Sequence, residues 1–190
     1  MQTTFPRLML KHAAERPTAP ALREKEYGIW QATSWAALSQ MVESIACGLH
    51  QAGLQRGEHL IVVGANRPRL YATMLAAQTL GAIPVPLYQD AAAAECVFPI
   101  TNAEVRFAVV EDQEQVDKML EVREQCPQLT HIYYDDPRGL RKYNEAGLGS
   151  LEELMAAGGV FAQQHPQFFK EEVDKAQYTD VAAMFFTSGT

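Results

Sequence analysis

The chain ends on four small residues that could bind phosphate: Thr187, Ser188, Gly189 and Thr190. They follow an apolar run over residues 181–186, whose length and unbroken apolarity predict a β-strand buried on both faces. Hydroxyl groups donate to phosphate oxygens, glycine lets the backbone approach closely, and successive N–H groups can surround an anion. The sequence therefore predicts a phosphate loop at the carboxyl end of a buried strand, where open α/β sheets bind their ligands.

The other residues with reactive side chains are dispersed. Taken alone, the four terminal residues also fit an ordinary turn, and neither Gly-x-x-x-x-Gly-Lys-Ser/Thr nor a Gly-x-Gly-x-x-Gly after a predicted strand occurs. The five histidines stand singly, and the three cysteines form no Cys-x-x-Cys pair. Acidic pairs at residues 111–112 and 135–136 lie at a predicted strand exit and in a loop, where capping and solvation explain them. We therefore predict no catalytic residue and no metal ligand in this chain, and three reduced, mostly buried thiols.

Strand and helix patterns alternate along the rest of the chain and must position the terminal loop. Branched and apolar runs predict strands over residues 59–63, 83–87, 105–110 and 129–134, before the run at 181–186. Apolar periodicity and caps predict helices over residues 3–15, 35–52, 66–80, 91–101, 113–124, 151–157 and 168–175. Residues 21–24 and 27–31 predict a hairpin. This order indicates an α/β fold, a mainly parallel sheet flanked by helices in αβα layers, with an N-terminal hairpin.

Prolines, acidic caps and a glycine pair set the expected boundaries. Pro84 and Pro86 cannot donate ladder hydrogen bonds, so their strand should be irregular or near an edge of the sheet. Asp90 and Asp112 are placed to cap the helices that follow them. The glycines at residues 158–159 predict the end of the helix that begins near residue 151.

Charge and hydropathy restrict the possible partners. The chain has 190 residues and a formal net charge of −7, without clusters of lysine or arginine. Because nucleic-acid surfaces need clustered cations, we expect no nucleic-acid partner. The N-terminus lacks the pattern of a signal peptide, and no apolar run approaches the ~20 residues of a membrane span. We therefore expect a cytoplasmic protein with no transmembrane segment.

Short segments spread through most of the chain carry a family resemblance. They lie at residues 35–38, 46–49, 53–57, 64–68 and 80–86, and residues 185–190 read Phe-Phe-Thr-Ser-Gly-Thr. Together they resemble the N-terminal part of the adenylate-forming (AMP-binding) superfamily of acyl-CoA synthetases, whose signature loop is Thr-Ser-Gly-Thr-Thr-Gly-x-Pro-Lys-Gly. Residues 86–88, 109–118 and 135–140 are most similar to bacterial long-chain fatty-acid CoA ligases.

The resemblance implies a two-step ligase. A carboxylic acid, here a long-chain fatty acid, attacks the α-phosphate of ATP to give an acyl-adenylate and pyrophosphate, and the thiol of coenzyme A then displaces AMP. Thr187, Ser188, Gly189 and Thr190 would hold the β- and γ-phosphates, with Mg²⁺ sharing their charge. Residues 1–190 would be the N-terminal portion of the large AMP-binding domain, inactive without the rest of that domain and the small C-terminal domain that carries the catalytic lysine.

Two alternatives stay open. An adenylation domain that loads a carrier protein would share the fold and differ in its acyl acceptor. A stand-alone, non-catalytic α/β module would keep only the front half of the ligase and form a stable monomer. A portion of a larger domain should instead expose an apolar face where the remainder packs, with poor solubility or self-association.

Overall fold

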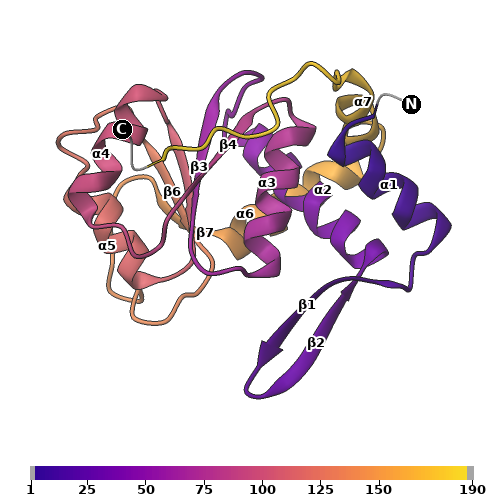
Figure 1. Ribbon diagram of the computed structural model, residues 1–190, viewed down its shortest axis with the longest axis horizontal. Coiled ribbons are helices and arrows are strands. Elements are labelled where there is room, and N and C mark those ends of the chain that lie inside the picture. The colour runs from indigo at the N-terminus through magenta and orange to yellow at the C-terminus, as the bar shows by residue number, and fades with distance from the viewer. Residues whose placement is uncertain (1–2, 188–190) are drawn as a thin grey trace.

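The fold consists of one five-stranded sheet, one hairpin and seven helices within residues 3–187, the part of the 190-residue chain that the computed structural model describes (Figure 1). The helices are α1 (Phe5–Glu15), α2 (Trp35–Gln51), α3 (Pro68–Thr79), α4 (Ala93–Asn102), α5 (Gln113–Glu121), α6 (Leu151–Gln164) and α7 (Phe168–Lys175). The strands are β1 (Pro20–Glu26), β2 (Ile29–Ser34), β3 (His59–Val63), β4 (Ile83–Leu87), β5 (Phe107–Val110), β6 (His131–Tyr134) and β7 (Leu148–Ser150).

The large sheet is parallel throughout and has the strand order β4-β3-β5-β6-β7. Side chains alternate along each strand, so Leu60 and Val62 of β3 enter one core while Ile61 and Val63 enter another. Helices α2, α3 and α6 cover the first face, and α4 and α5 cover the second (Figure 1). The predicted αβα layers are therefore confirmed, and burial on both faces explains the unbroken apolar runs.

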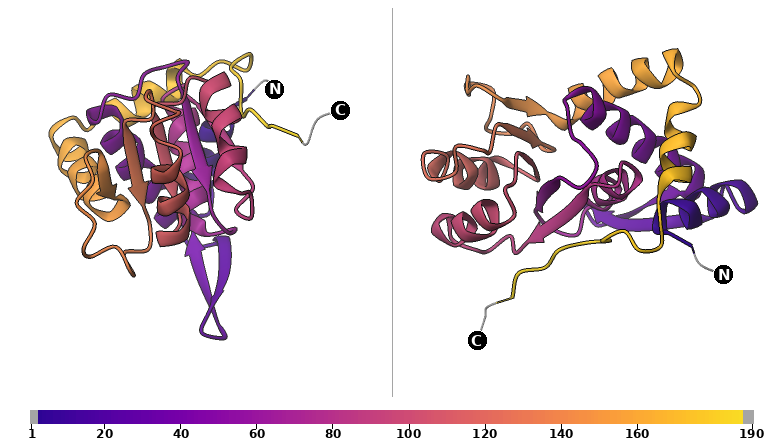
Figure 2. Two further views of the ribbon diagram at one scale, coloured as in Figure 1. Left: turned by 90° about the vertical axis from the view of Figure 1, so that its left-hand side faces the viewer. Right: turned by 90° about the horizontal axis from the view of Figure 1, so that it is seen from above.

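The hairpin β1–β2 projects away from the sheet (Figure 2). Its two strands pair antiparallel, and the turn places Tyr27 and Gly28 at positive φ angles of 46° and 83°. Tyr27 is 89% exposed at the tip, and both faces of the outer half are open to solvent. The hairpin touches the rest of the molecule mainly through its base near α2 and α3.

Helix α6 continues through the glycine pair, so the predicted end at residue 157 is wrong. A Cβ atom on Gly158 would lie 1.9 Å from the carbonyl oxygen of Ser44 and 2.6 Å from the nitrogen of Gly48, both in α2. Residue 158 is therefore a glycine because the backbones of α2 and α6 touch there. Helix α6 continues past it and ends at Gln164.

The larger differences from the prediction concern residues 181–186, strand β7 and the cap of α4, whereas several other ends differ by two or three residues. Residues 181–186 form no strand within the described part of the chain, although they lie beside β4. Strand β7 was missed because its three residues lie in a stretch with the composition of a loop. Helix α4 begins after Ala92, whose N–H donates to the Glu95 carboxylate at 2.8 Å, so Asp90 is not its cap. The predicted cap Asp112 is confirmed, since its side chain accepts from the Gln115 N–H.

Candidate functional site

A cleft of 560 Å³ lies at the carboxyl ends of β3 and β4. Residues 64–66, which follow β3, and residues 88–90, which follow β4, form two of its walls, while Tyr71 and Met74 of α3 form a third. Phe185 closes it from the C-terminal part of the chain. This is the edge of a parallel sheet at which ligands bind in open α/β folds.

The approach segment, residues 176–187, leads from α7 along β4 to this cleft. Asp180 and Ala182 share a pocket with Gly81 and Ala82 at the start of β4, whereas Phe185 reaches the cleft at the end of β4. The approach segment therefore runs parallel to β4, as the yellow ribbon in Figure 1 shows.

The approach segment delivers Thr187 beyond this cleft. Thr187 is exposed and lies two residues after Phe185, which lines the cleft. The other predicted phosphate ligands, Ser188, Gly189 and Thr190, lie outside the described residues. The structure thus describes one of the four predicted site residues, Thr187, and Phe185, two residues before it, lies at the carboxyl edge of the sheet.

Gly64 and Glu111 fix the exit of β3 beside the cleft. Gly64 has a φ of 154°, and a Cβ atom there would lie 2.5 Å from the Cβ of Glu111. This close approach lets the Glu111 carboxylate accept hydrogen bonds from the Ala65 N–H and from Arg67 Nε at 2.9 Å. Arg67 also lies 3.6 Å from Glu24 of β1, so one guanidinium connects the hairpin to the sheet. Glu111 therefore has a structural role at the rim of the site.

The acidic residues near this edge are all engaged by partners within the described chain. Asp112 caps α5, as predicted. Arg69 pairs with Asp135 at 3.1 Å, and Arg138 pairs with Asp136. Burial raises the pKa of Asp135, against the opposing charge of Arg69, whereas hydrogen bonds from Arg138 lower the pKa of Asp136. Capping and ion pairing thus account for these carboxylates.

Two tyrosines contribute hydroxyl groups to the cleft, Tyr71 and Tyr88, and the sequence analysis assigned neither of them a role in the site. The Tyr71 hydroxyl donates to Asn66 Oδ1 at 3.0 Å across the mouth of the cleft. Tyr88 is 73% exposed at the rim, and a hydrogen bond to the Asp90 carboxylate raises the pKa of its hydroxyl. For Tyr71 the available signal was positional, because the first turn of a helix that follows a parallel strand faces the ligand edge.

Between residues 3 and 187, no three or more His, Cys, Asp or Glu side chains form a group that could hold a metal ion. In the same range no helix has both the length and the apolarity needed to cross a bilayer. The three cysteines are buried and unbonded, and burial together with the Glu43 charge raises the pKa of Cys47 to about 12.

Comparison with known proteins gives a consistent set of similarities. The family model described as "AMP-binding enzyme" matches residues 9–190. The long-chain-fatty-acid–CoA ligase ACSBG2 of Homo sapiens is 26% identical over 190 residues, which cover 98% of this chain and 27% of that protein. The long-chain-fatty-acid–CoA ligase FadD15 of Mycobacterium tuberculosis is 22% identical over 183 residues, covering 96% of this chain and 29% of that protein.

Solved structures show the same fold. Acetoacetyl-CoA synthetase from Streptomyces lividans superposes with a TM-score of 0.71 at 23% sequence identity, over 80% of this chain and 25% of that one. Coronafacic acid ligase from Pectobacterium brasiliense superposes with a TM-score of 0.69 over 80% of this chain and 29% of that one. The chain thus spans between a quarter and a third of the length of these relatives.

Proposed function

Because this chain belongs to the AMP-binding enzyme family, we propose that it is the N-terminal portion of the large AMP-binding domain of an ATP-dependent carboxylic-acid CoA ligase. Its acid is a long-chain fatty acid, the substrate class in the names of the human and mycobacterial relatives. The enzyme forms an acyl-adenylate and pyrophosphate from the acid and ATP, and coenzyme A then takes the acyl group and releases AMP.

One observation carries this proposal: the approach segment brings Phe185, two residues before Thr187, into a cleft of 560 Å³ at the carboxyl edge of the sheet. The hydroxyl of Thr187 can donate to a phosphate oxygen, and the neighbouring Ser188, Gly189 and Thr190 would add hydroxyl and N–H donors. Binding of this kind places the β- and γ-phosphates as a leaving group and stabilises the charge that develops on them.

Exposed apolar side chains support the proposal that the chain is part of a larger domain. Phe98 is 66% exposed and meets Phe186 edge to face, with ring centroids 5.8 Å apart. Tyr88 and Phe185, which line the 560 Å³ cleft, are 73% and 69% exposed. The remainder of the AMP-binding domain would cover this surface, since contiguous exposed apolar surface commonly marks an interface.

Mg²⁺ and the catalytic lysine have no assigned position in this portion. Residues 3–187 offer no cluster of metal-binding side chains, so we assign no Mg²⁺ ligand among them. When bound, Mg²⁺ would neutralise phosphate charge. The part of the reaction that we assign to this chain is therefore the hydrogen bonding of the ATP phosphates by the loop that begins at Thr187.

The test is acid-dependent exchange of pyrophosphate with ATP, measured on the full-length enzyme with a panel of acids. Long-chain fatty acids should support the exchange. Thr187→Val should lower its kcat/KM for ATP by roughly 10- to 100-fold, the value of one hydrogen bond to a charged group. Thr187→Ser keeps the hydroxyl and should stay near wild type. No exchange with any acid, or equal rates in both variants, would count against the assignment.

The acyl acceptor requires a second measurement. Product formation should depend on coenzyme A, whereas thioester formation on a protein without coenzyme A would favour an adenylation domain that loads a carrier. The coding sequence after residue 190 gives an independent check, because it should continue as Thr-Gly-x-Pro-Lys-Gly or a close variant. A stop codon there, with a stable monomer in solution, would favour the stand-alone module.

A further inference from the structure

The approach segment lies against a sheet edge that cannot form a parallel ladder with it. Its one backbone hydrogen bond to β4 runs from the Met184 N–H to the Pro84 carbonyl at 3.0 Å. In a parallel ladder of this register, the carbonyl of Ala182 would accept from residue 84 and the carbonyl of Met184 from residue 86. Both of those residues are proline and have no N–H. The β4 edge therefore offers acceptors and lacks the matching donors.

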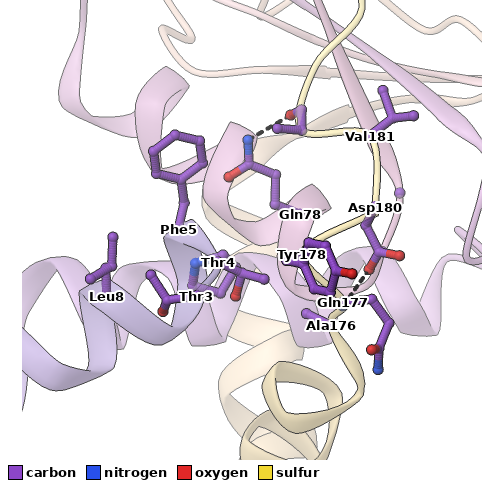
Figure 3. A pocket seen from close by; sticks show the side chains of 14 residues that line it. Thr3, Thr4, Phe5, Leu8, Gln78, Ala176, Gln177, Tyr178, Asp180 and Val181 are labelled. Atoms are coloured by element: carbon purple, nitrogen blue, oxygen red, sulfur yellow. Dashed lines mark hydrogen bonds between the residues drawn. The ribbon is translucent and has the colours of Figure 1, made fainter. Parts of the chain in front are cut away.

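Gln78 supplies one of the missing donors. Its side-chain Nε2 donates to the Ala182 carbonyl at 2.6 Å, although the two residues are 104 positions apart. Gln78 lies on the last turn of α3, and Figure 3 shows its amide pointing to the approach segment. The carbonyl that a residue-84 N–H would satisfy in a regular ladder is thus satisfied by a side chain of α3.

Asp180 forms an ion pair with Arg56 near the start of the approach segment. Asp180 Oδ2 accepts from the Gln177 N–H at 2.9 Å and lies 3.2 Å from a guanidinium nitrogen of Arg56. That guanidinium occupies the space beside Gly81, where a Cβ atom would lie 2.1 Å from Arg56 Nη1. The ion pair is exposed and contributes little energy by itself. The hydrogen bond from the Gln78 amide to the Ala182 carbonyl therefore holds the segment in register with β4.

We propose that Gln78 is a positioning residue, whose side-chain amide replaces the N–H that Pro84 lacks and so fixes the register of the approach segment that carries Thr187. The consequence for catalysis rests on the proposed function. The anchor, which is the hydrogen bond from Gln78 to Ala182, is a contact within the described chain. A slip of the segment by one residue would turn Phe185 away from the cleft and move Thr187 along the sheet edge.

Amide hydrogen exchange at Met184 tests the anchor directly in the 190-residue chain. Gln78→Ala should speed the exchange of the Met184 amide by about tenfold, corresponding to the loss of one hydrogen bond. Gln78→Glu has the same shape but replaces the donor with an acceptor, and should produce the same loss even if the alanine variant folds poorly. Gln55→Ala is the control, since Gln55 Nε2 donates only within its own loop, to the Gly53 carbonyl.

A second-site variant separates the anchor from general packing. Pro84→Ala restores a backbone N–H opposite Ala182, so adding it to Gln78→Ala should return Met184 exchange to the rate of the Pro84→Ala single variant. Unchanged exchange in both Gln78 variants would overturn the proposal. The proposal would also be overturned if the Met184 amide exchanged as fast in the double variant as in Gln78→Ala, while it stayed protected in Pro84→Ala alone.

The catalytic consequence is measured on the full-length enzyme. Gln78→Ala should raise the KM for ATP in pyrophosphate exchange several-fold more than it lowers kcat, and Pro84→Ala should reverse that effect. If the wild-type enzyme shows no acid-dependent exchange, the proposed function fails, while Met184 exchange still decides the anchor. If the wild type is active and Gln78→Ala leaves the KM for ATP unchanged, the proposed effect on phosphate binding is refuted.

Discussion

Alanine at Gly158 should destabilise the fold, whereas alanine at the adjacent Gly159 should stabilise it. A Cβ on Gly158 would lie 1.9 Å from the Ser44 carbonyl oxygen and 2.6 Å from the Gly48 nitrogen. Both contacts are with the backbone of α2, which cannot rotate away as a side chain could. The helices would have to separate by about 1 Å to restore ordinary contact distances in a closely packed interior.

The sizes of the two effects follow from this geometry. Overpacking costs about 1–3 kcal/mol, and alanine regains about 1 kcal/mol over glycine inside a helix. Because the clash at Gly158 is with rigid backbone, we expect a net loss of about 2 kcal/mol in the free energy of unfolding. Nothing lies within 4 Å of a Cβ on Gly159, so that variant should gain about 0.5–1 kcal/mol.

Urea unfolding followed by far-UV circular dichroism measures both variants against the unmodified chain. A lower midpoint for Gly158→Ala and a higher one for Gly159→Ala, with an unchanged slope, would support the contact between α2 and α6. Gly48→Ala should resemble Gly158→Ala, since its Cβ would lie 2.4 Å from the Leu154 carbonyl oxygen. Equal shifts in the same direction at Gly158 and Gly159 would refute the reasoning.

Three further predictions concern titration, reactivity and capping. Burial, and then the Arg106 charge, lower the pKa of His131 from its ordinary 6.5. The neutral imidazole therefore contributes to the free energy of unfolding above pH 6.5, and this contribution is lost as the pH falls through the lowered pKa. His131→Gln should flatten the decline in unfolding free energy between about pH 7 and pH 5, and parallel curves would contradict this. Because Cys47 is buried and burial raises the pKa of its thiol to about 12, a thiol reagent should label Cys47 only after denaturation, and rapid labelling of Cys47 in the native chain would contradict its burial. Asp112→Ala should cost about 1 kcal/mol by removing the α5 cap while Asp112→Asn stays near wild type, and equal losses would argue against capping.

Local signals were sufficient where an element's identity depends on its own residues. The strands at residues 59–63 and 83–87 were predicted with their observed bounds, because burial on both faces leaves an unbroken apolar run between turn residues. The cap at Asp112 was predicted for a similar reason, since the capping bond joins residues three apart. The same signals established the order of strands and helices, and hence the layers.

The errors arose where a distant part of the chain decides the outcome. Gly158 looks like a helix end until Ser44 and Gly48 are placed against it. Residues 181–186 have the composition of a buried strand, but the strand beside them cannot complete the ladder. The sequence shows the prolines of β4. It does not show that residues 181–186 lie beside β4, because that depends on the fold.

The candidate site could also be predicted from the sequence only in part. Phe185 reaches the edge that the rule for parallel sheets predicts, although the strand expected before Thr187 does not form. Gln78 carries no such signal, because its partner, Ala182, depends on how the approach segment lies against α3. A hydrogen bond across 104 residues has no local pattern that could announce it.

The two prolines of β4 also affect how the protein behaves among other copies of itself. An open strand edge with regular donors and acceptors recruits strands from neighbouring molecules and starts aggregation. Here Pro84 and Pro86 occupy the two positions that would donate outward from the sheet. A nascent chain whose later residues have not yet been synthesised therefore presents an edge to which intermolecular β-pairing cannot readily add.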